Sequence, residues 1–477
     1  MTLRELFTPF TSRAPDLEVR GVTHDSRRVE PGFVFVALPG RRFDGHRFVA
    51  DAVARGALAV VGAEPLELTV PYLRLAASEL RPALARLAAR FYGRPSRQLW
   101  IAGVTGTDGK TTTSFLLRHL LAASGLAAGM IGTVGYDVGA GLVLPQDHFT
   151  TPEAPEVQGL LAEMMRGGLK HAVLEASSHA LAQHRLDEVE FDLAVWTHLS
   201  PEHLDFHGDM EGYFAAKAKL VERARLAVLN RDCPYARRLD QRPHLSYGAG
   251  GDFEISELLE EGAGLRFAFT SPAGRYQAFL PMLGRYNAEN ALAAVAAAHA
   301  AGVAVGEAAQ ALASFAGVPG RMQIIQTEPF RVVVDFAHTP KGLSATLSAL
   351  RPTTAGRLIV VIGSAGERDP GKRAPLGRTA LEYADMAVFT EEDSRSEPVE
   401  AILAEMARGA KGAGGREGKS YRLEPDRARA IALAFELAAD GDTVLLAGKG
   451  HERTLERAGE VLRWDEAALA RRLLGLE

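Results

Sequence analysis

Hydrophobic and polar positions along the middle of the chain repeat in the order apolar strand, glycine turn, amphipathic helix. The apolar runs lie at residues 99–104, 172–174 and 193–197. Strands that alternate with helical patterns predict a doubly wound, mainly parallel sheet of the α/β class. Residues 251–281 have an alternating pattern of apolar and polar positions with Gly, Ser and Pro turns, which predicts antiparallel hairpins. An alanine-rich helix is expected at 288–301.

The two flanking segments carry α/β patterns of their own. The first mixes short strands, expected at 33–38 and 58–61, with a helical stretch at 78–92, and ends in a Gly-Arg-Pro-Ser linker. In the last segment we expect strands at 332–335, 358–362, 386–390 and 443–447. Each ends at polar or glycine residues, where open α/β sheets bind ligands. We therefore predict three domains, at 1–95, 96–318 and 319–477.

Composition agrees with this division and excludes several classes of protein. A chain of 477 residues fits about three domains at roughly 100 to 200 residues each. The small net charge of -5 gives no support for a nucleic-acid partner. The single cysteine, Cys233, excludes an internal disulfide and a multi-cysteine metal site. No apolar run reaches the roughly 18 residues of a membrane span, and Arg4, Glu5 and Pro9 stand where a signal peptide would be apolar. We expect a cytoplasmic protein.

The cations are unevenly divided, with nine lysines and 45 arginines, and the chain has only three asparagines. A lysine inside a glycine-rich loop is therefore less easily explained as a generic surface cation. Such a lysine occurs in Gly103-Val-Thr-Gly-Thr-Asp-Gly-Lys-Thr-Thr-Thr113, between an expected strand and an amphipathic helix. This arrangement aims backbone N–H groups and the helix dipole at an anion.

In this loop, Lys110 can reach the outer phosphates of a nucleotide, and the Thr111 hydroxyl can bind Mg²⁺. The strict pattern GxxxxGK[ST] needs glycine at position 104, where this chain has Val104, so the loop is a variant. The alternative, a glycine turn with an incidental lysine, is disfavoured by the flanking strand and helix.

Other polar residues follow the expected strands. Glu175 comes directly after the strand at 172–174, where a carboxylate can hold Mg²⁺; a surface glutamate is an equal alternative. His203 and His207 enclose no glutamate, so HExxH is lacking and a zinc hydrolase is disfavoured. One histidine near a nucleotide-bound Mg²⁺ is possible, and His198 and His207 also fit ordinary loop histidines.

Two further pairs lie on expected helices. By composition alone, Lys217 and Lys219 are solvated cations. Asn287 and Asn290 open the alanine-rich helix, where they either cap its N-terminus or hydrogen-bond a base.

Together these residues resemble the ATP-dependent Mur ligases of peptidoglycan synthesis, and within them the enzymes that add the third residue to UDP-N-acetylmuramoyl-L-Ala-D-Glu. The similarity covers nearly the whole chain and is carried by His24-Asp-Ser-Arg27, Gly106-Thr-Asp-Gly-Lys-Thr-Thr112, Thr150-Thr-Pro152, Glu175-Ala-Ser-Ser-His179, Leu199-Ser-Pro-Glu-His-Leu-Asp205, Gly284-Arg-Tyr-Asn287, Asp335-Phe-Ala-His-Thr-Pro340 and Gly448-Lys-Gly-His-Glu452. The resemblance implies a three-domain architecture with a central P-loop-type ATPase domain and a C-terminal Rossmann-like domain.

The resemblance also implies roles for individual residues. The N-terminal segment would bind the UDP-sugar through Ser26, and the muramoyl-peptide portion would contact Thr150, Thr151, Ser177, Gln183 and Arg185. ATP would be bound by Gly106, Thr107, Asp108, Gly109, Lys110, Thr111, Thr112, Asn287, Arg321 and Asp335. Two Mg²⁺ ions would be held by Thr111, Glu175, His203 and Lys217. In the family this lysine carries a CO2-derived carbamate, and the catalytic set would be Lys110, Glu175, His203 and Lys217.

The implied reaction transfers the γ-phosphoryl group of ATP to the side-chain carboxylate of D-Glu, giving an acyl phosphate. The amine of a diamino acid then attacks the carbonyl carbon and releases phosphate. Phosphoryl transfer needs positioning and charge neutralisation more than a protein nucleophile, and a lysine, a helix N-terminus and two Mg²⁺ ions supply both. Closure of the C-terminal domain would exclude water.

The amino acid would be bound by Arg368, Asp393, Arg395, Gly448 and Glu452. Family members that use meso-diaminopimelate carry Asp-Asn-Pro-Arg, where this chain has Glu392-Asp-Ser-Arg395. Arg395 could pair a distal carboxylate, but Asp393 replaces an amide with a negative charge. An acidic setting suits L-lysine or L-ornithine, whose distal group is only an ammonium, better than meso-diaminopimelate.

Further departures from the family pattern are Asp108, Phe149 and Lys341, at positions where Asn, Asn and Asp are common. They leave open a paralogue with altered substrate. The rivals are a ligase of the MurF type, a folylpolyglutamate-type synthetase, a generic P-loop hydrolase and a nucleotide-binding regulatory protein without ligase activity. The last predicts a damaged metal set, whereas Thr111, Glu175, His203 and Lys217 are all present.

Overall fold

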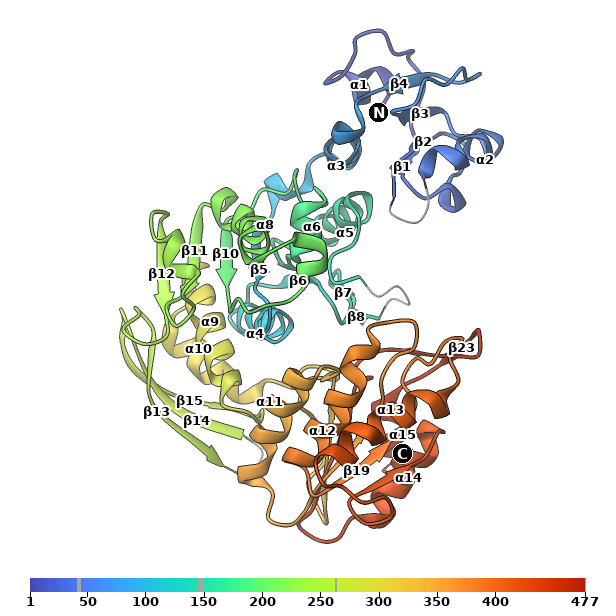
Figure 1. Ribbon diagram of the computed structural model, residues 1–477. Coiled ribbons are helices and arrows are strands. Elements are labelled where there is room, and N and C mark those ends of the chain that lie inside the picture. Colours follow the sequence, from blue (N-terminus) through green and yellow to red (C-terminus); the bar gives the residue numbers. More distant parts are fainter. Residues whose placement is uncertain (41–43, 145–148, 262–263, 477) are drawn as a thin grey trace. The chain divides into compact units, whose positions relative to one another are not determined.

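The computed structural model describes residues 1–40, 44–144, 149–261 and 264–476 (Figure 1). The chain divides into two compact units, Met1–Lys110 with Leu121–Tyr247 and Thr111–Leu120 with Gly248–Glu477. The domain borders predicted at 95/96 and 318/319 each fall inside one unit, and they stay predictions. No helix among the described residues is both long enough and apolar enough to cross a membrane.

The first unit begins with a small parallel sheet. Its strands are, in order, β1 (Gly21–Thr23), β2 (Phe33–Val36), β3 (Ala59–Gly62) and β4 (Tyr72–Arg74). Its helices are α1 (Leu3–Phe7), α2 (Val49–Ala54) and α3 (Leu80–Phe91). Leucines along one side of α3 share a buried core with alternate residues of β2, because helical and strand periodicities each present one apolar face. The strands expected at 33–38 and 58–61 are confirmed; β1 and β4, with three residues each, were not anticipated.

An eight-stranded sheet follows in the same unit. Its order is β12 (His244–Tyr247), β11 (Leu226–Asn230), β10 (Leu193–Trp196), β5 (Trp100–Thr105), β9 (His171–Glu175), β6 (Ala128–Ile131), β7 (Tyr136–Asp137) and β8 (Leu142–Val143). The first six strands are parallel, and the last two pairings are antiparallel. The helices of this part are α5 (Ala154–Arg166), α6 (Ser178–Ala182), α7 (Leu204–His207) and α8 (Met210–Arg223), whereas α4 (Lys110–Ala123), which follows β5 in the chain, belongs mostly to the second unit.

This confirms the predicted doubly wound, mainly parallel sheet. The three strands at its centre, β10, β5 and β9, are buried along most of their length, as strands covered on both faces are. Because they are parallel, their carboxyl ends meet at one edge of the sheet. That edge carries the loop after Thr105, Glu175 itself and the loop after Trp196.

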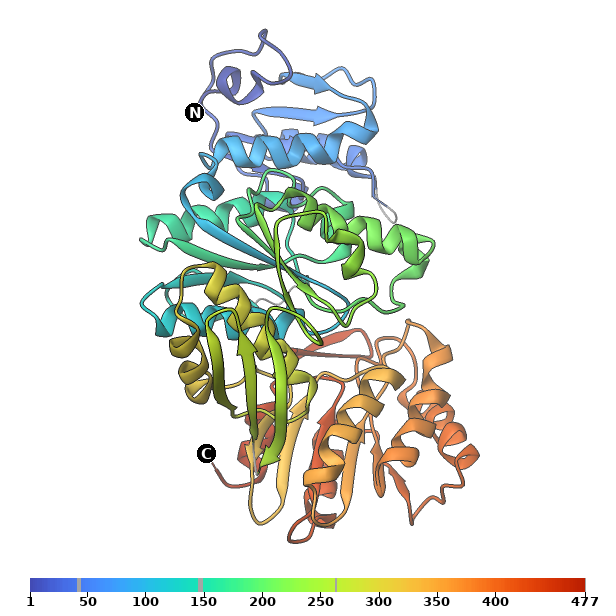
Figure 2. The same cartoon turned by 90° about the vertical axis from the view of Figure 1, so that its left-hand side faces the viewer.

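The second unit contains the predicted antiparallel hairpins. Figure 2 shows β13 (Glu254–Glu261), β14 (Gly264–Ser271) and β15 (Gly274–Leu280) side by side in yellow-green. The alanine-rich helix is α9 (Tyr286–Ala300), followed by α10 (Val305–Ala311). Alanine side chains are small enough to let nearly every turn of α9 pack closely, and ten of its residues are buried.

The remainder of the second unit is a six-stranded sheet with helices and a hairpin. The order is β16 (Gln323–Gln326), β17 (Arg331–Asp335), β21 (Thr443–Ala447), β18 (Leu358–Ile362), β19 (Met386–Phe389) and β20 (Tyr421–Leu423), with only β16 antiparallel. The hairpin is β22 (Thr454–Arg457) with β23 (Glu460–Arg463). The helices are α11 (Pro340–Leu350), α12 (Arg373–Tyr383), α13 (Val399–Gly412), α14 (Arg427–Leu437) and α15 (Glu466–Leu473). All four predicted strands are present.

Candidate active site

The glycine loop is anchored to the loop that follows β10. Gly106 has a φ of 150°, and a Cβ placed on it would lie 1.9 Å from Thr197 Oγ1, so only glycine fits. Thr107 Oγ1 accepts from the backbone N–H of Ser200 at 3.0 Å, and Thr197 Oγ1 donates to the Asp108 carbonyl at 2.6 Å. These contacts fix the loop shape immediately before α4 begins at Lys110.

Two lysines meet at one carbonyl of this loop. Lys110 Nζ donates to Gly106 O at 3.0 Å and to Thr107 O at 2.8 Å. Lys217 Nζ, from α8, donates to the same Gly106 O at 2.6 Å and is 1% exposed. Burial lowers the pKa of Lys217 well below its usual value, and the charge of Lys110 lowers it further. The interpretation of Lys217 as a solvated cation is therefore wrong.

The residues expected to bind the muramoyl-peptide form one network. Thr151 Oγ1 donates to Ser177 Oγ at 3.1 Å, and Arg185 donates to the Thr151 carbonyl at 2.7 Å. Arg185 also donates to Gln183 Oε1 at 2.8 Å and lies 3.0 Å from Glu153. Arg185 is thereby held rigidly, with its guanidinium beside the threonine and serine hydroxyls.

Glu175 is completely buried at the carboxyl end of β9, which excludes the surface alternative. Its two carboxylate oxygens accept from the Thr133 backbone N–H at 2.9 Å and from Thr133 Oγ1 at 2.8 Å. Thr133 Oγ1 also contacts Thr150 Oγ1 at 3.1 Å. Both carboxylate oxygens of this buried side chain are thus held by hydrogen bonds from Thr133. Thr133 was not singled out in the sequence, and no motif there pointed to it.

Three histidines and Tyr213 pack together beside these groups. The rings of His179 and His203 are 4.7 Å apart, and those of His207 and Tyr213 are 5.1 Å apart. Burial first, and then the neighbouring His203 and His207, lower the pKa of His179 to about 4. His203 precedes α7 in the left-handed conformation, with a φ of 54°. Across the described residues no group of three His, Cys, Asp or Glu side chains is placed to hold a metal ion.

Several of these parts line one cavity of about 270 Å³, although Glu175 and Gln183 are not among its lining residues. Its lining includes Lys110, Thr150, Thr151, Ser177, Arg185, His203 and Lys217, all predicted from the sequence, together with Phe149, Ser178, His179 and Tyr213. Ser26 lies elsewhere, half-buried just after β1 at the carboxyl edge of the small sheet. The cavity thus joins the phosphate loop to the expected substrate-binding side chains.

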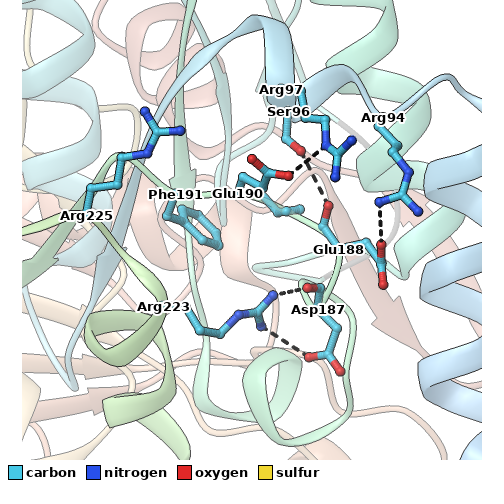
Figure 3. Close-up of a pocket in the computed structure, with 10 residues that line it drawn as sticks. Arg94, Ser96, Arg97, Asp187, Glu188, Glu190, Phe191, Arg223 and Arg225 are labelled. Atoms are coloured by element: carbon cyan, nitrogen blue, oxygen red, sulfur yellow. Dashed lines mark hydrogen bonds and ion pairs between the residues drawn. The ribbon is translucent and has the colours of Figure 1, made fainter.

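A second cavity, of about 350 Å³, contains no residue predicted to be functional (Figure 3). Its arginines are paired with neighbouring acids, Arg94 with Glu188 at 3.3 Å and Arg97 with Glu190 at 2.8 Å. We assign it a structural role, since its charges are already neutralised.

The residues expected near adenosine lie in the second unit. Asn287 is 1% exposed and donates to Leu283 O at 2.7 Å, while its Oδ1 accepts from Asn290 at 3.0 Å. Asn290 Oδ1 in turn accepts from Thr113 Oγ1 of α4 at 3.4 Å. Because α9 begins at Tyr286 with no side-chain cap, the capping interpretation of both asparagines is wrong.

Asp335 and Arg321 also have partners inside the second unit. Asp335 accepts from the backbone N–H groups of Met322 and Ala337 at 2.8 and 2.9 Å. The Arg321 guanidinium lies 4.4 Å from the ring centre of Phe336. Thr111 and Thr112 follow Lys110 in the first turn of α4, and both are buried. Binding of ATP by these residues stays a prediction.

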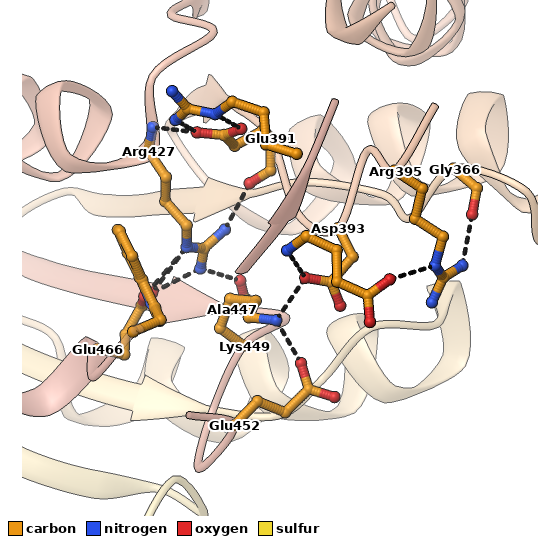
Figure 4. Close-up of polar contacts among 12 residues, drawn as sticks. Gly366, Glu391, Asp393, Arg395, Arg427, Ala447, Lys449, Glu452 and Glu466 are labelled. Carbon is orange, nitrogen blue, oxygen red and sulfur yellow. Dashed lines mark hydrogen bonds and ion pairs between the residues drawn. The ribbon is translucent and has the colours of Figure 1, made fainter. Parts of the chain in front are cut away.

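The expected amino-acid site contains a buried lysine, Lys449, which the sequence did not assign to it. Figure 4 shows Lys449 between Asp393 and Glu452. Its Nζ donates to Asp393 Oδ1 at 2.9 Å and to Glu452 Oε2 at 2.6 Å, and the residue is 0% exposed. Burial opposes the charge of Lys449, but the two carboxylates outweigh it and raise its pKa. The charge argument built on Asp393 therefore needs correction, because Lys449 neutralises that carboxylate.

The neighbouring acids differ in their pairing. Glu391 accepts from Arg457 Nε at 2.7 Å. Glu392 is buried, and its Oε2 has no hydrogen-bond partner within the described part of the chain. A Cβ on Gly448 would lie 2.9 Å from that oxygen. Arg368 is exposed. Among these acids, Glu392 thus has an oxygen left to accept a hydrogen bond.

Comparison with known proteins agrees with this geometry. Residues 18–92 match the description "Mur ligase family, catalytic domain", residues 104–298 "Mur ligase middle domain" and residues 320–450 "Mur ligase, glutamate ligase domain". A UDP-N-acetylmuramyl-tripeptide synthetase of Deinococcus radiodurans is 52% identical, covering 98% of this chain and 97% of its own length. A UDP-N-acetylmuramoyl-L-alanyl-D-glutamate--2,6-diaminopimelate ligase of Gloeobacter violaceus is 41% identical, covering 97% and 95%. A solved structure of a ligase with that same name has a TM-score of 0.69 at 31% identity, covering 100% and 99%.

Proposed function

The chain belongs to the Mur ligase family, and from this premise we propose that it adds a diamino acid to the D-Glu of UDP-N-acetylmuramoyl-L-Ala-D-Glu in peptidoglycan biosynthesis. L-Lysine and L-ornithine are favoured over meso-diaminopimelate. The observation that carries the proposal is the shared cavity, in which Lys110 of the phosphate loop lies with Thr151, Ser177 and Arg185.

In this reaction, ATP transfers its γ-phosphoryl group to the D-Glu side-chain carboxylate. Lys110 and the N-terminus of α4 supply positive charge to the phosphates, and Arg185 with the adjoining hydroxyls positions the acceptor. The amine of the diamino acid then forms the new C–N bond as phosphate leaves the carbonyl carbon and a proton leaves the nitrogen. Positioning and charge neutralisation suffice, so no protein nucleophile is required.

Individual residues support the Mg²⁺ ions and the carbamate expected from the family. Glu175 would supply a carboxylate held in place by Thr133, and Thr111 and His203 would supply further ligand atoms. Lys217 has a lowered pKa, and only a neutral amine reacts with CO2 to form a carbamate. Mg²⁺ at these residues would neutralise phosphate charge during transfer.

The choice of amino acid is supported by an acidic oxygen without a partner. Asp393 and Glu452 share Lys449, and Glu391 is bound by Arg457, so Glu392 Oε2 remains as the buried oxygen that can accept from a distal ammonium. L-Lysine and L-ornithine bring that ammonium without a second carboxylate. The names of the relatives do not decide this point, since they include both tripeptide synthetases and 2,6-diaminopimelate ligases.

The test is phosphate release from ATP in the presence of UDP-N-acetylmuramoyl-L-Ala-D-Glu and one amino acid at a time. We expect turnover that depends on L-lysine or L-ornithine, with the tripeptide product verified by mass. Absence of amino-acid-dependent turnover with these two and with meso-diaminopimelate would contradict the ligase function. Turnover with meso-diaminopimelate alone would contradict only the choice of amino acid.

A further inference from the structure

The guanidinium of Arg395 is bound by Glu456, an acidic side chain of the hairpin β22–β23. Arg395 Nε donates to Glu456 Oε2 at 2.9 Å, and its Nη1 donates to the Gly366 carbonyl at 2.6 Å. The two side chains are only 21% and 34% exposed, which makes this pair stronger than a fully solvated one. The guanidinium that could pair a distal carboxylate of the incoming amino acid is thus already bound to a carboxylate of the protein.

The backbone keeps Glu456 in this place. The Arg395 N–H donates to the Glu456 carbonyl at 3.0 Å, and the Glu456 N–H donates to Asp393 Oδ1 at 3.0 Å. Asp393 is itself held by Lys449. Glu456 is therefore attached to the expected amino-acid site through its main chain on both sides, so its side chain is a fixed part of that site.

Three cations around this pair are each bound to carboxylates of the chain. Arg395 is paired with Glu456, Lys449 with Asp393 and Glu452, and Arg457 with Glu391. The Oε2 of Glu392 has no hydrogen-bond partner among the described residues, and the buried Arg427 interacts with Glu392 electrostatically. A ligand that approaches this group meets an arginine that is already paired with an acid.

We propose that Glu456 is a specificity-determining residue that excludes diamino acids with a distal carboxylate by occupying Arg395. This inference rests on the proposed ligase function. A distal carboxylate must displace Glu456 from the guanidinium and then remain beside it, and juxtaposed like charges are strongly unfavourable. A diamino acid with only a distal ammonium leaves the Arg395–Glu456 pair intact. Glu456 thus acts by repelling the wrong substrate.

The experiment compares the wild-type chain with Glu456→Gln and Glu456→Ala. The matched control is Glu460→Gln, which makes the same charge change on the exposed strand β23 of the same hairpin. For each protein, kcat/KM is measured by phosphate release with L-lysine, L-ornithine and meso-diaminopimelate, at saturating ATP and UDP-N-acetylmuramoyl-L-Ala-D-Glu.

We expect both Glu456 variants to shift the ratio of kcat/KM values towards meso-diaminopimelate by about tenfold or more, through a rise in the meso-diaminopimelate value. The KM for ATP and the ratio in Glu460→Gln should stay at their wild-type values. A wild-type preference for meso-diaminopimelate, a ratio unchanged in the Glu456 variants, or an equal shift in the control would contradict the proposal.

Two other outcomes are separable from these. Loss of turnover with all three amino acids in both Glu456 variants would mark the residue as structural and contradict its role in specificity. No turnover by the wild-type chain with any amino acid would contradict the ligase function itself. Turnover by the wild type with an unchanged ratio in the variants leaves the ligase function standing and removes only the role of Glu456.

Discussion

Replacing Lys217 with alanine tests the chemistry of the cavity most directly. The substitution removes a 1% exposed amine that donates to Gly106 O at 2.6 Å. In the proposed reaction this amine carries a carbamate that orients Mg²⁺ at the phosphates. Loss of one preorganised electrostatic group in a buried site lowers kcat by about 10² to 10³, or roughly 2.7 to 4 kcal/mol. We expect Lys217→Ala to fall in that range or lower.

The assay is phosphate release at saturating substrates, with Lys219→Ala as the control, since Lys219 lies two residues along the same helix and is partly exposed. Short carboxylic acids should restore part of the activity of Lys217→Ala by supplying the missing carboxylate. A ¹³C signal from labelled bicarbonate should appear in the wild type and be absent from Lys217→Ala. Activity of Lys217→Ala within tenfold of the wild type would refute the reasoning. A labelled signal that persists in the variant would refute the carbamate at Lys217.

Three further substitutions test the structure. Gly106→Ala forces a Cβ to within 1.9 Å of Thr197 Oγ1, so we expect a raised KM for ATP; an unchanged KM would show that the loop tolerates the side chain. Arg427→Met leaves Glu466 buried without its 2.5 Å partner, which should lower the free energy of unfolding by about 3 to 5 kcal/mol in urea titrations. Replacing Glu466 as well should recover part of that loss, and no recovery would contradict the pairing argument. Burial lowers the pKa of His171 below 6.5, so the unfolded chain binds the proton more tightly and stability falls as the pH drops through that region. His171→Phe should weaken this fall in melting temperatures measured on either side of pH 6.5, and an unchanged fall would exclude His171 as its cause.

The sequence predicted the scaffold of the site because local patterns specify it. The run before Gly106 is apolar, the glycines permit the turn, and the following residues have helical periodicity, so strand β5, the loop and α4 were all expected. Glu175 could be placed because it lies at the end of a strand whose carboxyl end shares an edge with the phosphate loop, whereas Arg185 was named only through the family resemblance. Short edge strands such as β1 and β20 carry too few residues for a periodicity to appear.

The contacts that determine the chemistry of the site join residues far apart in the chain, so no local sequence pattern indicates them. In the sequence Lys217 looks like an ordinary helix lysine, because its contact with Gly106, 111 residues away, is visible only in the structure. Lys449 pairs with Asp393, 56 residues away in the sequence, so Asp393 does not add the unpaired negative charge that the sequence suggested. Glu456 was overlooked altogether, because its role exists only through its contact with Arg395. Composition gave one useful hint, since two of the nine lysines are the buried ones in these sites.

Because Lys217 and Lys449 are buried, the rates at which their amines react with a labelling reagent can report local opening of the structure. The seven other lysines are at least partly exposed, and none precedes Lys110. An amine-reactive reagent should label those seven quickly. In protein freed of CO2, so that Lys217 carries no carbamate, it reaches Lys217 only when the surroundings of α8 open, and Lys449 only when the end of β21 does. The two labelling rates therefore measure opening free energies of separate regions in a single native sample, without any engineered probe.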